Sequence, residues 1–256
     1  MDVAATDDHY LAADLASRAG TVLLEIRQRL IAEGAPTSLM RHEGDRRSHE
    51  FLMEALASNR PDDAVLSEEG SAHACHPERD TSIRTWIIDP VDGTREYSEP
   101  PRTDWAVHVA LAERGQPTVG AVALPGLGIT LSTLNPPSVH DLPPVSSQPR
   151  IVVSRSRPPA EALAVCEALN GELVEMGSAG AKAMAVVRGD VDCYLHSGGQ
   201  YEWDSCAPVA VALAAGFHAS RIDGRPLSYD QPDPFLPDLI VCRSELVDVV
   251  LAAITA

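Results

Sequence analysis

Apolar residues recur along the chain with two different periods, and this patterning separates a first part from a second. Between residues 10 and 31 they return at helical spacing, and Asp7 or Asp8 is placed to cap the start of the helix. The charged segment 41–47 is expected to be a loop, and a second helical pattern follows it and ends at Asn59. The start of the chain therefore predicts two helices.

Short runs rich in β-branched residues predict several strands after these helices. The run Trp86-Ile87-Ile88 is expected to stop at Asp89, because Pro90 has no backbone N–H with which to continue the pairing. Further strands are predicted at 65–67, 105–112, 118–124 and 129–134, with a hairpin turn at 113–117.

The second part alternates strands with helices. Residues 135–149 contain five prolines and few apolar residues, a composition typical of an extended connector. Beyond it, the pattern predicts strands at 151–154, 173–176 and 239–242, and helices at 158–170, from the turn at 177 to about 189, at 201–215 and at 244–254. This alternation favours an α/β arrangement. We therefore divide the chain into an N-terminal α+β half (1–137), a proline-rich connector (138–150) and a C-terminal α/β half (151–256).

The composition limits what kind of protein this is. The chain has 256 residues, of which 45% are hydrophobic, enough for one large domain or two modest ones. Its net charge of −17 repels a nucleic-acid backbone, so binding to a nucleic-acid polymer is not expected. An anionic small substrate stays open, because bound divalent ions reverse the potential inside a site. The five cysteines are scattered and fit reduced thiols better than a disulfide framework.

The sequence shows no targeting signal. No basic segment followed by an apolar run opens the chain, and no stretch of 18 uncharged apolar residues occurs. Neither secretion nor a membrane span is predicted, and we expect a cytoplasmic protein.

Acidic residues directly follow two of the predicted strands. Glu68 comes after the strand at 65–67, and Asp89 and Asp92 follow the run that ends at Ile88. If the two strands are neighbours, Glu68 and Asp89 face one cation. Taken alone, each segment is more typical of an ordinary acidic turn, because Asp-Pro-x-Asp-Gly is rich in turn formers.

Other segments supply groups that suit a phosphorylated ligand. Gly93 lets the backbone approach a ligand, and the amides after Thr94 favour an anion. The glycine-rich turn before Lys182 either holds a phosphate or serves close packing, and Asp204 either caps a helix or binds a cation. His73-Ala74-Cys75-His76 resembles part of a zinc site, but no second cluster completes four ligands, so a plain loop is expected.

Taken together, three segments resemble the inositol monophosphatase superfamily of lithium-sensitive, magnesium-dependent phosphatases. They are Ser67-Glu68-Glu69, the segment 86–94 (WIIDPVDGT) and Glu202-Trp203-Asp204, and both their order and their spacing agree. The resemblance covers nearly the whole chain and implies a layered α/β (α+β) sandwich with the site between its halves. The segments 152–157, 177–182 and 223–229 further resemble the bacterial bisphosphate nucleotidases of CysQ type, which remove the 3′-phosphate of 3′-phosphoadenosine 5′-phosphate and serve sulfate assimilation.

The resemblance implies a metal set. Glu68, Asp89 and the Val91 carbonyl would hold one Mg²⁺, and Asp89, Asp92 and Asp204 a second. Such all-oxygen ligands favour a hard ion, Mg²⁺ or its substitute Mn²⁺, over zinc. The resemblance also allows a third ion, implies inhibition by lithium, and leaves a homodimer as one option.

The resemblance also implies the catalytic and substrate-binding residues. Asp45, which lies 23 residues before Glu68, would pair with Thr94 to position the attacking water, although the relatives carry Pro-Val-Thr-x-Ala-Asp where this chain has Arg41-His42-Glu43-Gly44-Asp45. A small phosphorylated nucleotide, sugar phosphate or inositol phosphate would contact Glu68, Gly93, Thr94, Arg95, Ser178, Lys182, Arg155, Arg157 and Asp204. Of these, Arg155, Arg157 and Lys182 are candidates for a second phosphate, or else solvated surface charges.

Three alternatives remain. A haloacid-dehalogenase-type phosphatase separates its two acids by a single residue, whereas Pro90 and Val91 intervene here and Glu68 would have no role. Within the resembled family, inositol monophosphatase or fructose bisphosphatase activity shares the same metal residues. A non-catalytic metal or nucleotide sensor would require a broken metal set, and all the positions are filled.

Overall fold

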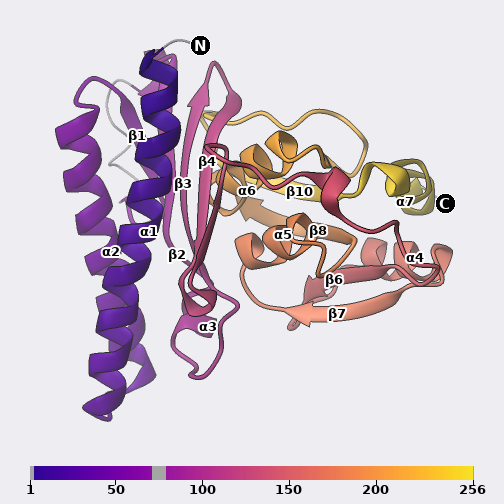
Figure 1. Ribbon diagram of the computed structural model, residues 1–256, viewed down its shortest axis with the longest axis horizontal. Helices are drawn as coiled ribbons and strands as arrows, with labels where there is room; N and C mark the ends of the chain where they lie inside the picture. Colours follow the sequence, from indigo (N-terminus) through magenta and orange to yellow (C-terminus); the bar gives the residue numbers. More distant parts are fainter. Residues whose placement is uncertain (1–2, 71–78, 256) are drawn as a thin grey trace.

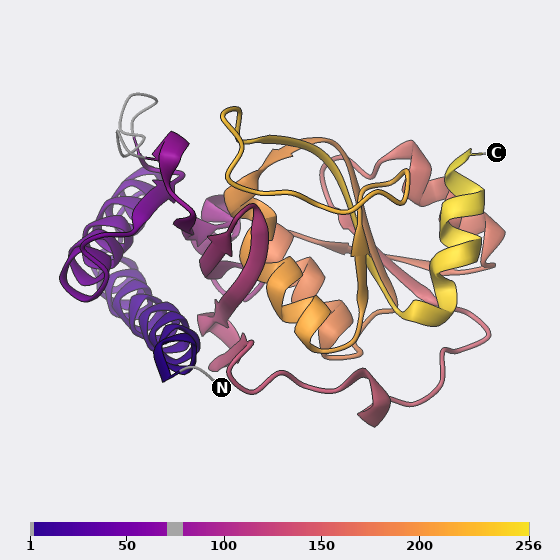
Figure 2. The same ribbon diagram turned by 90° about the horizontal axis from the view of Figure 1, so that it is seen from above.

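In the described part of the chain, two five-stranded sheets and three layers of helices are stacked in the order helix, sheet, helix, sheet, helix (Figures 1 and 2). The structure is a computed structural model and describes residues 3–70 and 79–255. This arrangement confirms the layered α/β sandwich expected from the sequence. None of the helices in the described ranges is long and apolar enough to cross a membrane.

The first half of the chain builds the outer helical layer and the first sheet. The long helices α1 (Val3–Ala32) and α2 (Thr37–Asn59) cover one face of a sheet with the order β1-β2-β3-β4-β5. Its strands are β1 (Ala64–Ser67), β2 (Arg84–Asp92), β3 (Ala106–Glu113), β4 (Gln116–Leu124) and β5 (Ile129–Ser132). β1 and β2 are parallel, and the other pairs are antiparallel. The predicted hairpin between β3 and β4 is confirmed, with Arg114 and Gly115 at positive φ in the turn.

Two expectations about the first helices are wrong. α1 begins at Val3, so Asp8 lies inside the helix instead of capping it. α2 begins at Thr37, so the charged segment 41–47 is helical and not a loop. Gly44 is in this helix for packing, because a Cβ there would lie 2.6 Å from the ring of Tyr97. The charges of this segment suggest a loop, but one face of it is buried against Tyr97.

The second half builds the remaining three layers. Its sheet has the order β7-β6-β8-β10-β9, with β6 (Arg150–Ser154), β7 (Glu172–Met176), β8 (Cys193–Tyr201), β9 (His218–Ser220) and β10 (Phe235–Cys242). Helices α5 (Ala179–Val187) and α6 (Glu202–Ala214) lie between the two sheets, and α4 (Ala160–Ala168) and α7 (Val247–Thr255) cover the outer face. Strands β8 and β9 have no counterpart in the sequence-based prediction.

One hydrophobic core joins the two halves. It contains Leu66 and Ile87 from the first sheet, Val186 and Val209 from the central helices, and Val152 from the second sheet. The central helices approach the first sheet closely, because a Cβ on Gly120 of β4 would lie 2.7 Å from the Ala207 carbonyl oxygen of α6. The connector between the sheets carries only a short 3₁₀ turn, Val139–Asp141. Because the core is continuous, the ends of β1, β2 and α6 are fixed relative to one another.

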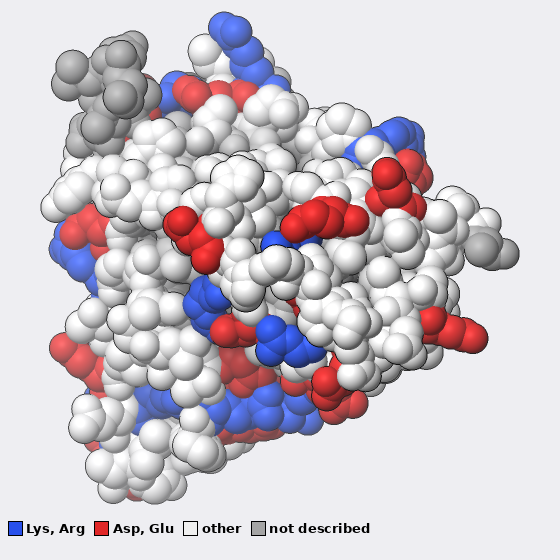
Figure 3. All heavy atoms as spheres, turned by 45° about the vertical axis from the view of Figure 1, so that its right-hand side comes forward, with Lys and Arg blue, Asp and Glu red and all other residues white. Residues whose placement is uncertain are grey.

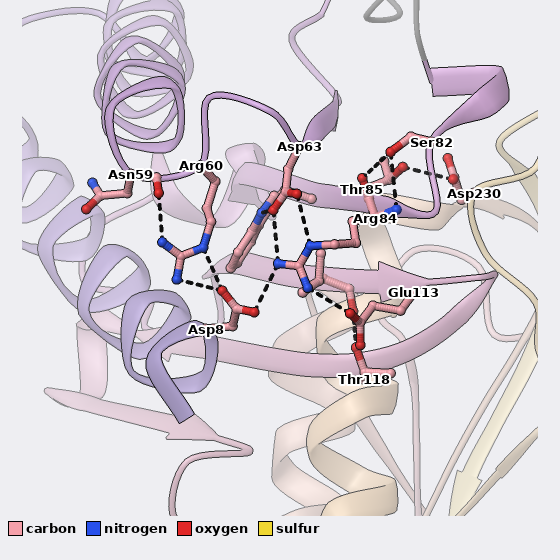
Figure 4. A network of polar contacts seen from close by, with 12 residues as sticks. Asp8, Asn59, Arg60, Asp63, Ser82, Arg84, Thr85, Glu113, Thr118 and Asp230 are labelled. Carbon is pink, nitrogen blue, oxygen red and sulfur yellow. Dashed lines mark hydrogen bonds and ion pairs between the residues drawn. The ribbon is translucent and has the colours of Figure 1, made fainter. Parts of the chain in front are cut away.

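An ion-pair network fastens the start of β2 (Figure 4). Arg84 donates to both oxygens of Asp63 at 2.9 and 3.0 Å, to Asp8 at 3.0 Å and to Glu113 at 2.7 Å. Asp8 also accepts from Arg60 at 2.7 Å. The network therefore ties three parts of the chain to the start of β2: α1, the segment that precedes β1, and β3. Asp89 and Asp92 lie at the other end of β2.

Candidate metal centre and active site

The strand β2 continues further than its sequence suggests. It runs through Pro90 to Asp92, which pairs with Ala106, and the register slips between Asp89 and Asp92. The expected end at Asp89 is therefore wrong: a bulge accommodates the missing N–H of proline and pairing then resumes. The bulge allows both acidic side chains to be placed near the end of the strand.

Glu68 and Asp89 lie side by side, as expected for neighbouring strands. β1 is parallel to β2, and the Glu68 amide donates to the Ile88 carbonyl at 3.3 Å. The two carboxyl groups share a hydrogen bond. Desolvation, together with the charges of Asp204 and Asp92, raises the pKa of Glu68 to about 7 although the residue as a whole is exposed. Burial and the Glu68 charge raise the pKa of Asp89 as well.

Asp92 is buried and anchors the central helix α5. Its carboxylate accepts from the backbone N–H of Gly180 at 2.6 Å and of Ala179 at 3.1 Å, and from the Ser178 hydroxyl. His108 lies 3.2 Å from it. Burial alone would raise the pKa of Asp92, but the His108 charge and these hydrogen bonds lower it to about 2. Asp92 therefore remains an anion throughout the neutral pH range.

Asp204 enters the cluster from the first turn of α6. One oxygen accepts from the Tyr201 backbone N–H at 2.7 Å, so the carboxylate does cap the helix. Asp89, Asp92 and Asp204 each also offer one oxygen, and these three oxygens lie within 4.8 Å of one another. Burial, followed by the Asp92 charge, raises the pKa of Asp204 to about 6. Capping and clustering therefore occur together, and the two readings of this residue do not compete.

The cluster fits a divalent cation. Burial raises the pKa values of Asp89 and Asp204, and the repulsion between the three neighbouring carboxylates raises them further. A hard cation would offset both effects, because it compensates the charges and accepts oxygen ligands. Asp92 differs from the others because hydrogen bonds already occupy both of its oxygens.

Asp45 and Thr94 are brought together across the site. Asp45 projects from α2, and a hydrogen bond joins its carboxyl to the Thr94 side chain. The Thr94 hydroxyl also lies 3.1 Å from the Val91 carbonyl, which is an alternative acceptor for its single proton. Burial and the charge of Glu69 raise the pKa of Asp45 to about 7, against the hydrogen bond from Thr94. A carboxyl group with such a pKa is suited to take up a proton at neutral pH.

Gly93 connects the acids to the short helix α3 (Thr94–Tyr97). It has φ 81°, and a Cβ there would lie 2.9 Å from the Cβ of Ser178. Glycine is therefore required both by the backbone and by the contact between the halves. Arg95 follows on the exposed side and pairs with Glu99 at 3.1 Å.

Ser178 and Lys182 are buried where α5 begins. Ser178 has φ 50°, its hydroxyl donates to Asp92, and it accepts from the Ala181 backbone N–H at 2.9 Å. The Lys182 ammonium donates to the carbonyl of Ser178 at 2.6 Å and of Gly177 at 3.3 Å. Burial lowers the pKa of Lys182, opposed by the charge of Asp92. The glycine-rich turn before Lys182 was expected either to hold a phosphate or to serve close packing, and these contacts show close packing.

Arg155 and Arg157 are the other two candidates for binding a second phosphate, and within the described ranges only Arg155 forms ion pairs. Arg155 pairs with Glu96 at 2.8 Å and with Glu99 at 2.9 Å. Arg157 is exposed, and among the described residues it has no hydrogen bond or ion pair. On the face shown in Figure 3, basic side chains lie beside acidic ones and do not form one broad basic surface.

Two histidines of the site escaped the sequence analysis. His108 on β3 is fully buried, and its Nδ1 lies 2.9 Å from the Trp203 carbonyl, so the ring bridges Asp92 and α6. His49 lies 2.9 Å from the Ser67 hydroxyl and one helical turn after Asp45. The i,i+4 spacing from Asp45 would have revealed His49, had the segment been read as helix. The zinc-like segment 73–76 lies outside the described residues.

Comparisons with known proteins agree on one family. The model of the inositol monophosphatase family matches residues 7–253. The 3′-phosphoadenosine 5′-phosphate phosphatase of Mycobacterium bovis is 49% identical over 242 residues, which cover 92% of this chain and 89% of that protein. The 3′(2′),5′-bisphosphate nucleotidase CysQ of Escherichia coli is 30% identical, covering 74% and 79%. The crystal structure of CysQ from Bacteroides thetaiotaomicron superimposes with a TM-score of 0.73 at 26% identity, covering 93% and 97%.

Proposed function

The chain belongs to the inositol monophosphatase family, and from that premise we propose that it is a magnesium-dependent phosphatase that hydrolyses the 3′-phosphate of 3′-phosphoadenosine 5′-phosphate to AMP and phosphate. The observation that carries the proposal is the cluster of Asp89, Asp92 and Asp204, with Glu68 beside Asp89, in a chain 49% identical to a phosphatase of that name. The role of the protein would be to remove 3′-phosphoadenosine 5′-phosphate, a by-product of sulfate assimilation.

Glu68, Asp89, the Val91 carbonyl, Asp92 and Asp204 would hold the ions, two or three Mg²⁺ with Mn²⁺ as a substitute. When bound, the ions would lower the pKa of a water molecule and stabilise the charge of the phosphoryl group. Asp92 would in addition anchor α5, because its oxygens also accept hydrogen bonds from the start of that helix. Removal of magnesium should therefore abolish turnover, and lithium should inhibit it.

Asp45 and Thr94 are the proposed catalytic pair. Asp45 would accept a proton from the attacking water, whose oxygen forms the new bond to phosphorus while the bond to the ribose 3′-oxygen breaks. The leaving 3′-oxygen takes up a proton from solvent, so AMP and inorganic phosphate result. The pKa of about 7 supports Asp45 in this role, and Thr94 would fix its orientation.

The substrate contacts are proposed by position. The Gly93 and Thr94 amides would hold the phosphoryl group, and Arg157 is our candidate for the second phosphate, because its guanidinium has no partner in the described parts of the chain. Arg155 and Arg95 are paired with acids, and Lys182 would act by shaping the turn at Ser178. A cytoplasmic location and a possible homodimer accompany the proposal.

The serious alternative is a broad phosphatase of inositol or fructose phosphates, because the metal residues are shared across the family. Phosphate release from 3′-phosphoadenosine 5′-phosphate, inositol 1-phosphate and fructose 1,6-bisphosphate, each with and without Mg²⁺, tests the proposal. Comparable kcat/KM on all three substrates would contradict the nucleotide assignment, and turnover after complete removal of divalent ions would contradict the metal mechanism.

A further inference from the structure

Three aromatic side chains form an exposed cluster where β8 passes into α6. The rings of Tyr201 and Trp203 are stacked, with centroids 4.7 Å apart and planes 9° apart. Phe235 meets Tyr201 edge to face at 6.1 Å. Tyr201 and Phe235 are 45% and 49% exposed. We call Tyr201, Trp203 and Phe235 the aromatic platform.

The platform is rigidly attached to the acidic cluster. The Tyr201 backbone N–H donates to Asp204 at 2.7 Å, so the residue that carries the exposed ring also orients a proposed metal ligand. The Trp203 carbonyl lies 2.9 Å from His108 Nδ1, and His108 in turn contacts Asp92. Phe235 pairs with Tyr201 across β10 and β8. Tyr201 and Trp203 therefore lie within three residues of Asp204 in the chain, and their backbones bond to groups of the acidic cluster.

Two glycines of β8 lie beside the platform, Gly199 against the Phe235 ring and Gly198 in open surroundings. Gly199 has φ 93°, and a Cβ on it would lie 2.5 Å from the Phe235 ring. Gly198 has φ 99°, and no atom of the described residues lies within 4 Å of a Cβ added to it, so its surroundings are open. His196, whose Nε2 lies 3.0 Å from the Gly199 carbonyl, braces this segment. The open space at Gly198 and the exposed ring of Tyr201 therefore lie on the same strand, β8.

We propose that the aromatic platform binds the purine base of the substrate by stacking, with Tyr201 as the residue that determines preference for a nucleotide over a base-free phosphate. The inference rests on the proposed function and names how the same site recognises its substrate. Every base has a π face, and stacking on an exposed ring adds affinity without a pattern of hydrogen bonds. The stack on Trp203 holds the Tyr201 ring in a fixed orientation, so little conformational entropy is lost on binding.

Turnover of Tyr201→Ala, Tyr201→Phe and Leu213→Ala tests the platform. Each variant is assayed with 3′-phosphoadenosine 5′-phosphate and with inositol 1-phosphate, and the ratio of the two kcat/KM values is compared. Stacking is worth about 1–3 kcal/mol per base, so the ratio should fall about 5- to 150-fold in Tyr201→Ala, chiefly through KM for the nucleotide. Tyr201→Phe keeps the aromatic ring and should therefore retain the wild-type ratio. Leu213, 47% exposed on α6, which begins directly after Tyr201, is the matched control for loss of exposed apolar surface.

A binding measurement separates the platform from the proposed function. Calorimetric titration with AMP in the presence of Mg²⁺ should show weaker binding to Tyr201→Ala by the same factor, whichever substrate the wild type prefers. Unchanged AMP affinity and an unchanged ratio would overturn the platform even if the wild type hydrolyses the nucleotide well. A change in oligomeric state of Tyr201→Ala on gel filtration, with the ratio unaltered, would instead assign these rings to an interface between copies.

Discussion

Arg84→Leu should destabilise the protein without changing its chemistry. Arg84 binds Asp63 through two hydrogen bonds and also pairs with Asp8 and Glu113 (Figure 4). The side chains of Asp8 and Asp63 are only 4% and 11% exposed, so removal of the guanidinium leaves two carboxylates with little access to water. The variant therefore differs from one that breaks a surface ion pair.

The magnitude follows from what remains of the network. Breaking a buried pair by removing one partner costs about 3–5 kcal/mol, whereas surface pairs contribute about 0–1 kcal/mol. Asp8 keeps Arg60 at 2.7 Å, and Asp63 keeps the Trp86 indole N–H at 2.9 Å. We therefore expect the lower end, about 3 kcal/mol, which corresponds to a fall in Tm of about 6–12 °C for a chain of this size.

Urea unfolding followed by circular dichroism, without added metal, measures the loss. Arg225→Leu is the control, because Arg225 and Asp223 form a pair with side chains 74% and 44% exposed, and this variant should unfold like the wild type. Phosphatase kcat at 25 °C should be unchanged in Arg84→Leu, because Arg84 stands at the opposite end of β2 from the acids. If Arg84→Leu lowered the free energy of unfolding by less than about 1 kcal/mol, the level of a surface ion pair, the conclusion that this network stabilises the fold would be refuted.

Three further predictions concern catalysis, pH and metal. Asp45→Asn should lower kcat by about 10²- to 10⁴-fold with unchanged circular dichroism, and near-normal turnover would remove Asp45 from the mechanism. Burial alone would raise the pKa of Asp238, but its bonds to Arg221 at 2.6 and 2.7 Å lower it. The pair's contribution is therefore complete above the unfolded pKa of about 3.9 and is lost as pH falls through the lower folded value. The difference in unfolding free energy between wild type and Asp238→Asn should shrink below that pH, and a constant difference would argue against the pair. Mg²⁺ should raise the Tm of the wild type, and an Asp89→Asn variant whose Tm rises equally would contradict Asp89 as a ligand.

The acids near the ends of β1 and β2 could be predicted from the sequence because their chemistry is local. An apolar run followed by a carboxylate places that group near the end of a strand, although β2 continues to Asp92, and the parallel pairing of β1 and β2 brings Glu68 beside Asp89. Asp204 could be placed only as a helix cap or a ligand, and the structure makes it a cap within the cluster.

The remainder depends on contacts between distant parts of the chain. Asp92 receives its hydrogen bonds from Ser178, Ala179 and Gly180, which no local pattern relates to it. His108 lies inside an apolar strand and becomes informative only when β3 meets α6.

Secondary structure failed where tertiary contacts override local signals. The segment 41–47 looks like a charged loop, yet it is helical, and Gly44 on its buried face leaves room for the Tyr97 ring. β8 was missed because Gly198 and Gly199 interrupt its pattern, although its first residues are buried. Glycine is conformationally permissive, so it can mark a bulge in a strand as readily as the end of one.

The most direct test of the account compares kcat/KM for 3′-phosphoadenosine 5′-phosphate, inositol 1-phosphate and fructose 1,6-bisphosphate with Mg²⁺ at one pH. We predict a preference for the nucleotide of about 100-fold, or about 2.7 kcal/mol of differential transition-state stabilisation. Equal kcat/KM for the three substrates would contradict the assignment and would indicate a phosphatase of broad specificity.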